Sequence, residues 1–396
     1  FSLESTIKDA AGNSATLTLP SPGTTGSLAV NKALVIDATA PWIVSKEGSD
    51  ELGNGSESKP FASIQKAIDS SKDGHIILVL PGTYKENISF KGKNITVASK
   101  YLTTEDKSYI ESTIIDGDEK GSVVTFKNGE DTTAVLSGFT ITNGLNKNGG
   151  GIKVSSSSPT LTDLLVTGNS ASKLSEQIIG SGGGIVIGNT SLIMRNITIS
   201  NNTASNGAGL VINGGGTPII ENIYIYDNYH VEGHNGDGAG IFIGGRSDVV
   251  TIKGAHIYNN TAIKSGGAIY AHSSQFKLIN ALIYNNSSRQ GTLMLISANA
   301  FLSNVTIAHN NDISIYNANS FTSLKNSIIW GNPDNLNSDD AFKNIEYSNV
   351  EGVSVGTGNI NSDPLFVDPD SSDYRLLPDS PLIDSGNPDS DGDGIT

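Results

Sequence analysis

Short apolar–polar–apolar segments recur along most of the chain, and each is followed by a turn that closes on asparagine. One copy is 223–228 (IYIYDN). Alternation with a period of two predicts a β-strand with one buried face. The closing asparagines lie 22 to 33 residues apart, at Asn169, Asn202, Asn228, Asn260, Asn286, Asn310 and Asn332. A repeat of this length predicts a fold of stacked structural units.

A second repeated motif interleaves with the first and is glycine-rich before its apolar alternation, as in 238–243 (GAGIFI). A third short strand precedes each asparagine motif, for example 275–278 (QFKL). Three strands per repeat predict one coil of an all-β, right-handed parallel β-helix with inward aliphatic rows. Asparagine suits one corner because it tolerates left-handed backbone and can bond to the asparagines above and below. Glycine suits the other corner, where φ is positive or coils approach closely.

The two ends of the chain differ from this repeat. Segment 60–70 (PFASIQKAIDS) has a helical apolar stripe and predicts a short N-terminal capping helix. Residues 42–59 are rich in Gly, Ser and Glu, which predicts a linker. We therefore expect the β-helix over 60–335, a C-terminal cap over 336–388 and an acidic tail over 389–396.

The repeats and the chain ends resemble known bacterial proteins. The motifs resemble right-handed β-helix proteins of the pectate-lyase-like superfamily, and 266–269 (GGAI) resembles repeats of polymorphic outer-membrane proteins. Segments 363–368 (DPLFVD) and 380–388 (SPLIDSGNP) resemble the common C-terminal cap of such helices. Segments 7–13 (IKDAAGN) and 35–41 (VIDATAP) resemble the last strands of bacterial immunoglobulin-like modules, so 1–41 is expected to be the tail of one.

The resemblance implies a piece of a larger extracellular or cell-surface protein. Its expected partners are a polysaccharide or cell-surface glycan and the flanking domains of the same polypeptide. The superfamily includes lyases, glycosidases, epimerases and adhesins, so the resemblance leaves the activity open.

Composition excludes several classes of function. The 396 residues contain 40 acidic and 25 basic side chains, a formal charge of −15, which argues against binding of nucleic-acid phosphates. The absence of cysteine excludes disulfides, zinc-thiolate sites and cysteine nucleophiles. No apolar stretch is long enough to predict a membrane span.

An aromatic row is the first candidate site. Alternation places Tyr226, Tyr258 and Tyr284 on the outer wall at equivalent positions of successive coils, with Trp330 further along the same row. Aromatic faces suit sugar rings, which predicts a glycan-binding surface. Cross-coil stacking without a ligand is the structural alternative.

The glycine-rich strands predict a second outward row, which is largely apolar. We expect loops near 173–179 and 230–235 to cover it; the alternative is a contact surface. The row contains Lys153, Val186, Val211, Phe242, Tyr270 and Met294.

Ionisable residues supply weaker candidates for chemistry. A polysaccharide lyase needs a base beside the reacting sugar carbon and a cation for the sugar carboxylate, and Lys253, His256 and Arg289 are candidates. The insert 227–237 (DNYHVEGHNGD) predicts a metal or acid–base site, or only a solvated loop. The candidate residues of this insert are His230, Glu232, His234 and Asp237.

The C-terminal segment 389–394 (DSDGDG) resembles the start of a calcium-binding loop. Alternating Asp389, Asp391 and Asp393 would supply oxygen ligands for Ca²⁺, and glycine permits the sharp turn. A solvated acidic linker is the alternative.

These features favour a rigid spacer and polysaccharide- or surface-binding, adhesin-like module, because no recognised catalytic signature is present. A polysaccharide lyase or glycoside hydrolase of the same fold is the alternative. A calcium-dependent self-associating element is a third hypothesis.

Overall fold

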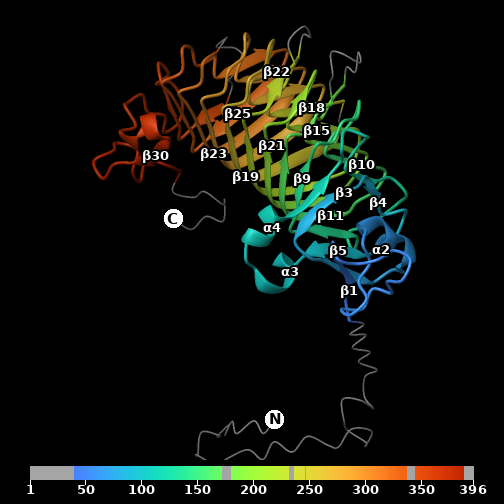
Figure 1. The fold of residues 1–396 in the computed structure, drawn as a ribbon. Helices are drawn as coiled ribbons and strands as arrows, with labels where there is room; N and C mark the ends of the chain where they lie inside the picture. The colour runs from blue at the N-terminus through green and yellow to red at the C-terminus, as the bar shows by residue number, and fades with distance from the viewer. Residues whose placement is uncertain (1–39, 172–179, 232–235, 246, 337–343, 388–396) are drawn as a thin grey trace, which may run out of the picture. The chain divides into compact units, whose positions relative to one another are not determined.

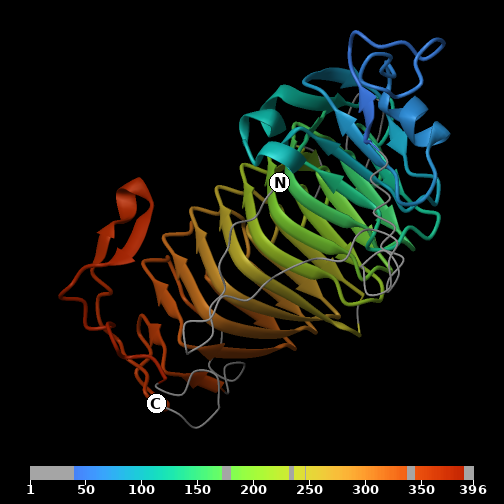
Figure 2. The same cartoon turned by 90° about the horizontal axis from the view of Figure 1, so that it is seen from below.

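The computed structural model describes residues 40–171, 180–231, 236–245, 247–336 and 344–387. The expected immunoglobulin-like tail and the aspartate-rich segment lie outside these residues, except for the last two positions of the tail. From Pro41 onward the chain forms one compact unit of stacked coils (Figures 1 and 2). The predicted parallel β-helix is confirmed, because strands from successive repeats pair in parallel and in register.

The glycine-rich motifs form one face of the helix, a parallel sheet of nine strands. In spatial order these strands are β4 (Ile88–Ser89), β7 (Val124–Phe126), β10 (Ile152–Ser155), β12 (Ile185–Gly188), β15 (Leu210–Asn213), β18 (Ile241–Gly244), β20 (Ile269–His272), β22 (Leu293–Ile296) and β24 (Ile315–Ala318).

The other strands of the coils belong to a parallel sheet of seventeen strands. They are β1 (Trp42–Val44), β2 (Ile76–Val79), β3 (Gly82–Lys85), β5 (Thr96–Ser99), β6 (Thr113–Asp116), β8 (Val135–Ser137), β9 (Thr140–Thr142), β11 (Thr160–Thr167), β13 (Ile193–Ser200), β16 (Ile219–Tyr226), β19 (Val249–Tyr258), β21 (Gln275–Tyr284), β23 (Asn299–Ala308), β25 (Phe321–Lys325), β26 (Ile328–Trp330), β27 (Asn344–Glu346) and β28 (Asn349–Val350).

Each long strand of this sheet consists of two legs joined at a bend. Within β16, for example, Asn222 has φ 54° and separates the legs. The predicted third strand and the asparagine motif are therefore one bent strand in the central coils. Left-handed residues occupy this bend in successive coils, at Asp163, Asn196, Asn222, Gly254, Asn280 and Asn304.

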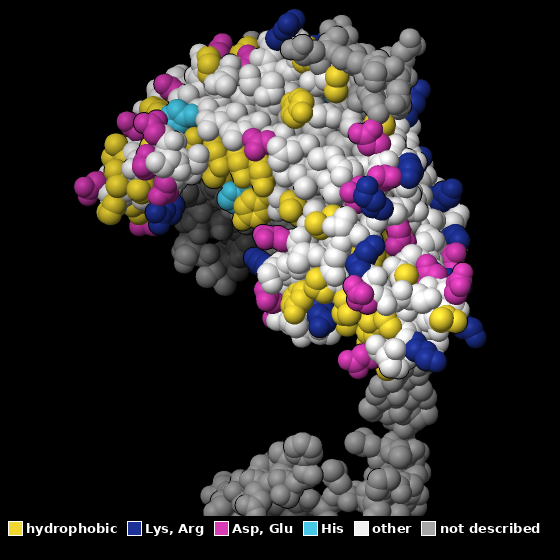
Figure 3. Space-filling view, viewed as in Figure 1, with side chains coloured by type: hydrophobic (Ala, Val, Ile, Leu, Met, Phe, Trp, Pro, Cys, Tyr) yellow, Lys and Arg dark blue, Asp and Glu magenta, His cyan; other side chains and the backbone are white. Residues whose placement is uncertain are grey.

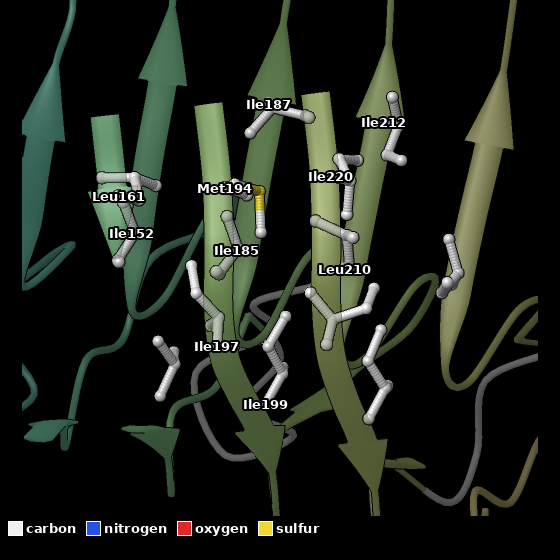
Figure 4. Packing of buried hydrophobic residues seen from close by; sticks show 14 of the residues in the cluster. Ile152, Leu161, Ile185, Ile187, Met194, Ile197, Ile199, Leu210, Ile212 and Ile220 are labelled. Carbon is white, nitrogen blue, oxygen red and sulfur yellow. The ribbon is translucent and has the colours of Figure 1, made fainter. Parts of the chain in front are cut away.

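Aliphatic side chains fill the interior of the coils (Figure 4). Ile185 and Leu210 come from the glycine-rich face, and Met194 and Ile220 come from the opposite sheet; each is at most 1% exposed. Parallel neighbours lie about 4.8 Å apart, so equivalent side chains of successive coils are in contact. Burial of each large aliphatic side chain stabilises the fold by about 1.5–3 kcal/mol.

A buried asparagine ladder fixes the corner that follows each long strand. The Nδ2 of Asn202 donates to Oδ1 of Asn228, and Nδ2 of Asn228 donates to Oδ1 of Asn260, both at 3.0 Å. The predicted bonding between stacked asparagines is thus present. The predicted left-handed backbone belongs instead to the preceding residue, such as Asn201 or Asp227, because the ladder asparagine turns its side chain inward.

The N-terminal end of the helix is capped by α2 (Ile64–Ser70), as the apolar stripe predicts. Buried Ile64 and Ile68 face the coils, and Oε1 of Glu86 accepts from the Ile64 amide at 2.8 Å. The preceding segment is not the expected linker throughout, because β1 pairs with β2 and starts the helix. Its Trp42 packs edge-on against Phe61.

The apolar row of the glycine-rich face is present in the predicted register. Val211 is fully buried, whereas Phe242 and Tyr270 stack at 5.2 Å between ring centroids. Part of the cover comes from the glycine turns. Gly207 has φ 55°, and a Cβ atom there would lie 2.2 Å from Cγ2 of Val211. Most of the loop residues expected to cover this row lie outside the described residues.

Four further segments flank the coils. The pair β14 (Thr203–Ala204) and β17 (Tyr229–His230) lies just beyond the asparagine corner. The helices α3 (Tyr101–Thr104) and α4 (Ser108–Ser112) interrupt an early coil. At the C-terminal end, η3 (Pro369–Ser371) joins β29 (Phe366–Asp368) to β30 (Asp373–Leu376) in an antiparallel hairpin.

Candidate functional site

One face of the helix is hollowed between two projecting segments. Figure 3 shows the hollow between the α3–α4 segment and the C-terminal hairpin, with hydrophobic side chains and a histidine along its wall. The second legs of the long strands supply the surface between these segments (Figure 1). The α3–α4 segment is fixed to the coils, because Oγ1 of Thr140 donates to the Ile110 carbonyl at 2.8 Å.

The predicted tyrosine row forms a close stack on this face. Ring centroids of Tyr226 and Tyr258 lie 4.8 Å apart with 10° between the ring planes, and those of Tyr258 and Tyr284 lie 4.9 Å apart with 5°. Tyr374 of the hairpin packs against Tyr284 at 5.1 Å. The rings therefore cover one another's flat faces. The remaining flat face is that of Tyr226 toward the small Ser200 on the preceding coil.

A second aromatic pair lies beside this stack. Tyr224 and His256 are 4.8 Å apart with 24° between their ring planes, and burial lowers the pKa of His256. On the preceding coil, the residue in register with Tyr224 is Thr198. No aromatic side chain therefore covers that face of the Tyr224 ring. Tyr224 is 45% exposed. The two tyrosines of β16 together form a ledge above the shorter side chains of β13.

A cavity of about 610 Å³ lies between this tyrosine ledge and the α3–α4 segment. This volume is typical of small-ligand sites. Strands β11 and β13 contribute residues between the two walls. The lining residues are Tyr101, Lys107, Ile110, Glu111, Asp163, Leu164, Leu165, Asn196, Thr198, Asn222, Tyr224 and Tyr226.

Polar groups of the cavity belong partly to the bends of the long strands. Oδ1 of Asp163 accepts from the Tyr101 hydroxyl at 3.1 Å and from Nδ2 of Asn196 at 3.0 Å. Nδ2 of Asn222 donates to Oδ1 of Asn196 at 3.3 Å. Burial and the nearby charge of Asp163 raise the pKa of Tyr101. The bends thus form an exposed ladder of amides along one side of the cavity.

The cavity combines aromatic faces with hydrogen-bonding groups. Tyr224 and Tyr226 offer apolar ring surface, and the amides of Asn196 and Asn222 offer donors and acceptors. Such a combination suits a sugar ring, which has apolar C–H faces and polar hydroxyl edges. Glu111 lines the same cavity as Asp163 and adds a second carboxylate.

The structure separates the candidate catalytic residues. Lys253 precedes the Gly254 bend and lines a different hollow, on the first legs of the strands. His256 follows that bend and stacks on Tyr224. Arg289 lies beyond the Asn286 corner, where its amide donates to the Lys264 carbonyl at 2.9 Å. These residues do not form one acid–base group.

Trp330 is in the register of the tyrosine row but not in its stack. Ala308 occupies the intervening coil between Tyr284 and Trp330. The indole is half-buried on β26. A glycan-binding role for Trp330 remains a prediction.

The candidate loop site is partly described. His230 is 4% exposed, and Nδ1 accepts from the Ile263 amide at 3.3 Å. Burial lowers the pKa of His230 to about 4. Oδ2 of Asp237 pairs with Nζ of Lys264 at 3.2 Å. Glu232 and His234 lie outside the described residues, as do Asp389, Asp391 and Asp393 with the predicted Ca²⁺ site.

Within the described ranges, no group of three or more His, Asp or Glu side chains is placed to hold a metal ion. The same part of the chain contains no helix of the length and apolarity needed to cross a membrane.

Sequence reasoning missed the exposed ladder and the α3–α4 wall. The ladder had a signal: Asp163, Asn196 and Asn222 each lie six residues before a closing asparagine. Tyr101, Lys107 and Glu111 lie outside the repeats, and only the fold brings them to β11 and β13.

Comparison with known proteins finds distant structural similarities. No protein-family model and no curated protein matches the sequence. Among solved structures, pectate lyase Pel9A is 16% identical (TM-score 0.43; 88% of this chain and 92% of that chain covered). Pectin methylesterase PemA from Erwinia chrysanthemi is 12% identical (TM-score 0.39; 89% and 97% covered), and the pectin methylesterase from carrot is 10% identical (TM-score 0.38; 78% and 89% covered). The chain has the right-handed parallel β-helix fold: strands of successive coils pair in parallel, and parallel crossovers are right-handed.

Proposed function

We propose that the protein binds polysaccharide, and that the cavity between the α3–α4 segment and the tyrosine ledge is its carbohydrate site. The observation that carries the proposal is the uncovered face of Tyr226 at the end of the tyrosine stack, inside the cavity. A sugar ring against this face would continue the stack by one more flat ring.

The surrounding groups support an uncharged sugar. Asn196, Asn222 and Thr198 offer neutral hydrogen-bonding groups beside the rings. Among the described lining residues, Lys107 is basic whereas Glu111 and Asp163 are acidic. An acidic sugar would therefore meet net negative charge in the cavity. Because the ledge belongs to packed strands, little ordering cost is expected on binding.

A second candidate function is polysaccharide cleavage by a lyase or glycoside hydrolase. It is favoured by Glu111 and Asp163, two carboxylates that line the same cavity as the aromatic faces. Paired carboxylates are the usual acid–base groups of glycoside hydrolysis. Lys107 would offer an amine for proton abstraction in a lyase.

A polysaccharide ligand also indicates where the protein acts and what the stacked coils do in a larger protein. We infer an extracellular or cell-surface location, in which the stacked coils also act as a rigid spacer between flanking domains. Calcium binding by Asp389, Asp391 and Asp393 stays a prediction, and titration of Ca²⁺ into a chain extended beyond this segment tests it.

Affinity electrophoresis in gels that contain neutral or acidic polysaccharides tests the binding function. We expect neutral polysaccharides such as galactomannan, xyloglucan or mixed-linkage glucan to slow the wild-type protein, and Tyr226→Ala to reduce the slowing strongly. Phe301→Ala is the matched control, because Phe301 is an exposed ring on β23 that does not line the cavity. Equal mobility of the wild type with and without every polysaccharide would contradict the proposal.

Incubation with the same polysaccharides distinguishes binding from cleavage. New reducing ends or absorbance at 235 nm, lost in both Glu111→Gln and Asp163→Asn, would establish the enzymatic candidate. Binding without products would support the binding function over polysaccharide cleavage.

A further inference from the structure

A second hollow lies around the corner from the cavity, beside the short strand β17. Its volume is about 880 Å³, and most of its lining comes from the coils of β13, β16 and β19. The lining residues are Asn201, Thr203, Asp227, Tyr229, His230, Val231, Asn259, Thr261 and Ile263.

Tyr229 is the single tyrosine among these lining residues, beside the buried imidazole of His230. It pairs in register with Thr203 on the preceding coil and with Thr261 on the following coil. Because both neighbours are short, neither face of the Tyr229 ring is covered by another aromatic ring, in contrast to Tyr258. The side chain is 51% exposed. Tyr229 thus has the accessible flat surface that the inner rings of the stack lack.

Polar side chains surround Tyr229 at fixed positions. Asn201, Asp227 and Asn259 occupy the left-handed corner of three successive coils, with φ of 54°, 53° and 53°. All three line the hollow, so two amides and one carboxylate share it with the ring. Hydroxyl groups can both donate to and accept from such groups.

Neighbouring residues of one coil line the two hollows. Tyr226 lines the first cavity, Asp227 lines the second, and Tyr229 follows three residues after Tyr226. Three residues span at most about 11 Å, even when fully extended. One ligand chain could therefore contact both tyrosines by passing over the corner at Asp227.

We propose that the hollow around Tyr229 is a second carbohydrate-binding site, and that one polysaccharide chain occupies both hollows. The proposal rests on the carbohydrate function assigned to the first cavity. When two linked sites bind one chain, the second contact is intramolecular, and the affinity for long chains exceeds that for short ones. The protein should accordingly prefer polymer to short oligosaccharides of the same sugar.

The test compares Tyr229→Ala and Tyr226→Ala on the neutral polysaccharide that slows the wild type most, and on di- and trisaccharides of the same sugar. We expect Tyr229→Ala to lower the affinity for the polymer by about ten-fold or more, with little effect on the short sugars. Tyr226→Ala should weaken both. Tyr229→Phe should bind like the wild type, because the flat ring remains.

Polymer binding by Tyr229→Ala equal to that of the wild type, together with loss in Tyr226→Ala, would overturn the second site and leave the first intact. Absence of wild-type binding to every polysaccharide would contradict the proposed function itself. Asn259→Gly is an independent variant, since glycine keeps the left-handed corner and removes only the amide. It should weaken polymer binding in the same direction as Tyr229→Ala.

Discussion

Two asparagine ladders run along this β-helix six residues apart in each coil, and they have opposite roles. In the buried ladder, Nδ2 of Asn228 donates to Oδ1 of Asn260 and to the carbonyl groups of Ile199 and Tyr226. In the exposed ladder, Nδ2 of Asn222 donates to Oδ1 of Asn196 at 3.3 Å. Burial decides the difference, because a buried amide must be fully bonded, whereas an exposed amide can exchange partners with water or ligand.

The exposed ladder also tolerates replacement. Glycine occupies it at Gly254, where the left-handed backbone is kept with φ 65°. The buried ladder is asparagine at every coil from Asn169 to Asn332. We infer that the exposed position requires only the bend, which leaves its side chains free for ligand contacts.

The largest expected effect is that of Asn228→Ala in the buried ladder. The change leaves the backbone amide and Nδ2 of Asn202 without their acceptor. Each buried donor left without an acceptor costs about 1–3 kcal/mol, so the two donors together should lower the free energy of unfolding by about 2–6 kcal/mol. Urea denaturation monitored by circular dichroism measures this loss. A loss below about 1 kcal/mol would contradict the role given to the buried ladder.

The pH dependence of stability tests the same buried corner, through His230, two residues after Asn228. The pKa of His230 is about 4 in the fold and near 6.5 when unfolded, so the unfolded chain binds the proton first as the pH falls. Stability is therefore retained above pH 6.5 and lost as the pH falls toward 4. Between pH 7 and 4.5 the loss from this group is about 2–3 kcal/mol.

The measurement compares urea unfolding of the wild type and His230→Leu at the two pH values. Carboxylates titrate in both proteins. The pH-dependent loss of unfolding free energy in the wild type, minus that in His230→Leu, therefore gives the contribution of His230. Equal pH dependence in the two proteins would show that His230 is not buried as a neutral group.

A smaller effect is expected at the end of the tyrosine stack. Tyr226→Ala should weaken binding of the best neutral polysaccharide about ten-fold, equivalent to about 1.4 kcal/mol. Tyr258→Leu is the comparison, because Tyr258 lies inside the stack and offers no free face. It should retain most of the affinity. Similar losses in both variants would indicate binding to ring edges along the whole row.

The smallest expected effect is that of Asn222→Gly in the exposed ladder. Glycine keeps the bend, as at Gly254, so the free energy of unfolding should change by about 0.5 kcal/mol or less. Affinity for the polysaccharide should fall a few-fold through the lost amide. Destabilisation as large as that of Asn228→Ala would remove the distinction between the two ladders.

The sequence predicted the repeated parts of the molecule better than the site. Spacing of Asn202, Asn228 and Asn260 predicts the coils, and alternation predicts the register of Tyr226 with Tyr258. The α3–α4 wall could not be predicted, since Tyr101 and Glu111 reach the cavity through the fold and not through a repeat. Cross-coil stacking of the tyrosine rings was predicted as the alternative to a ligand surface. The free face of Tyr226 was not predicted, because register gives which rings are neighbours but not their tilt.

The most direct test of the account is a crystal structure of the protein with an oligosaccharide from the polysaccharide that it binds best. We predict a sugar ring against the free face of Tyr226, between the tyrosine ledge and the α3–α4 segment, within reach of Asn196 or Asn222. A sugar bound on the glycine-rich face, with the cavity beside Tyr226 empty, would contradict the account.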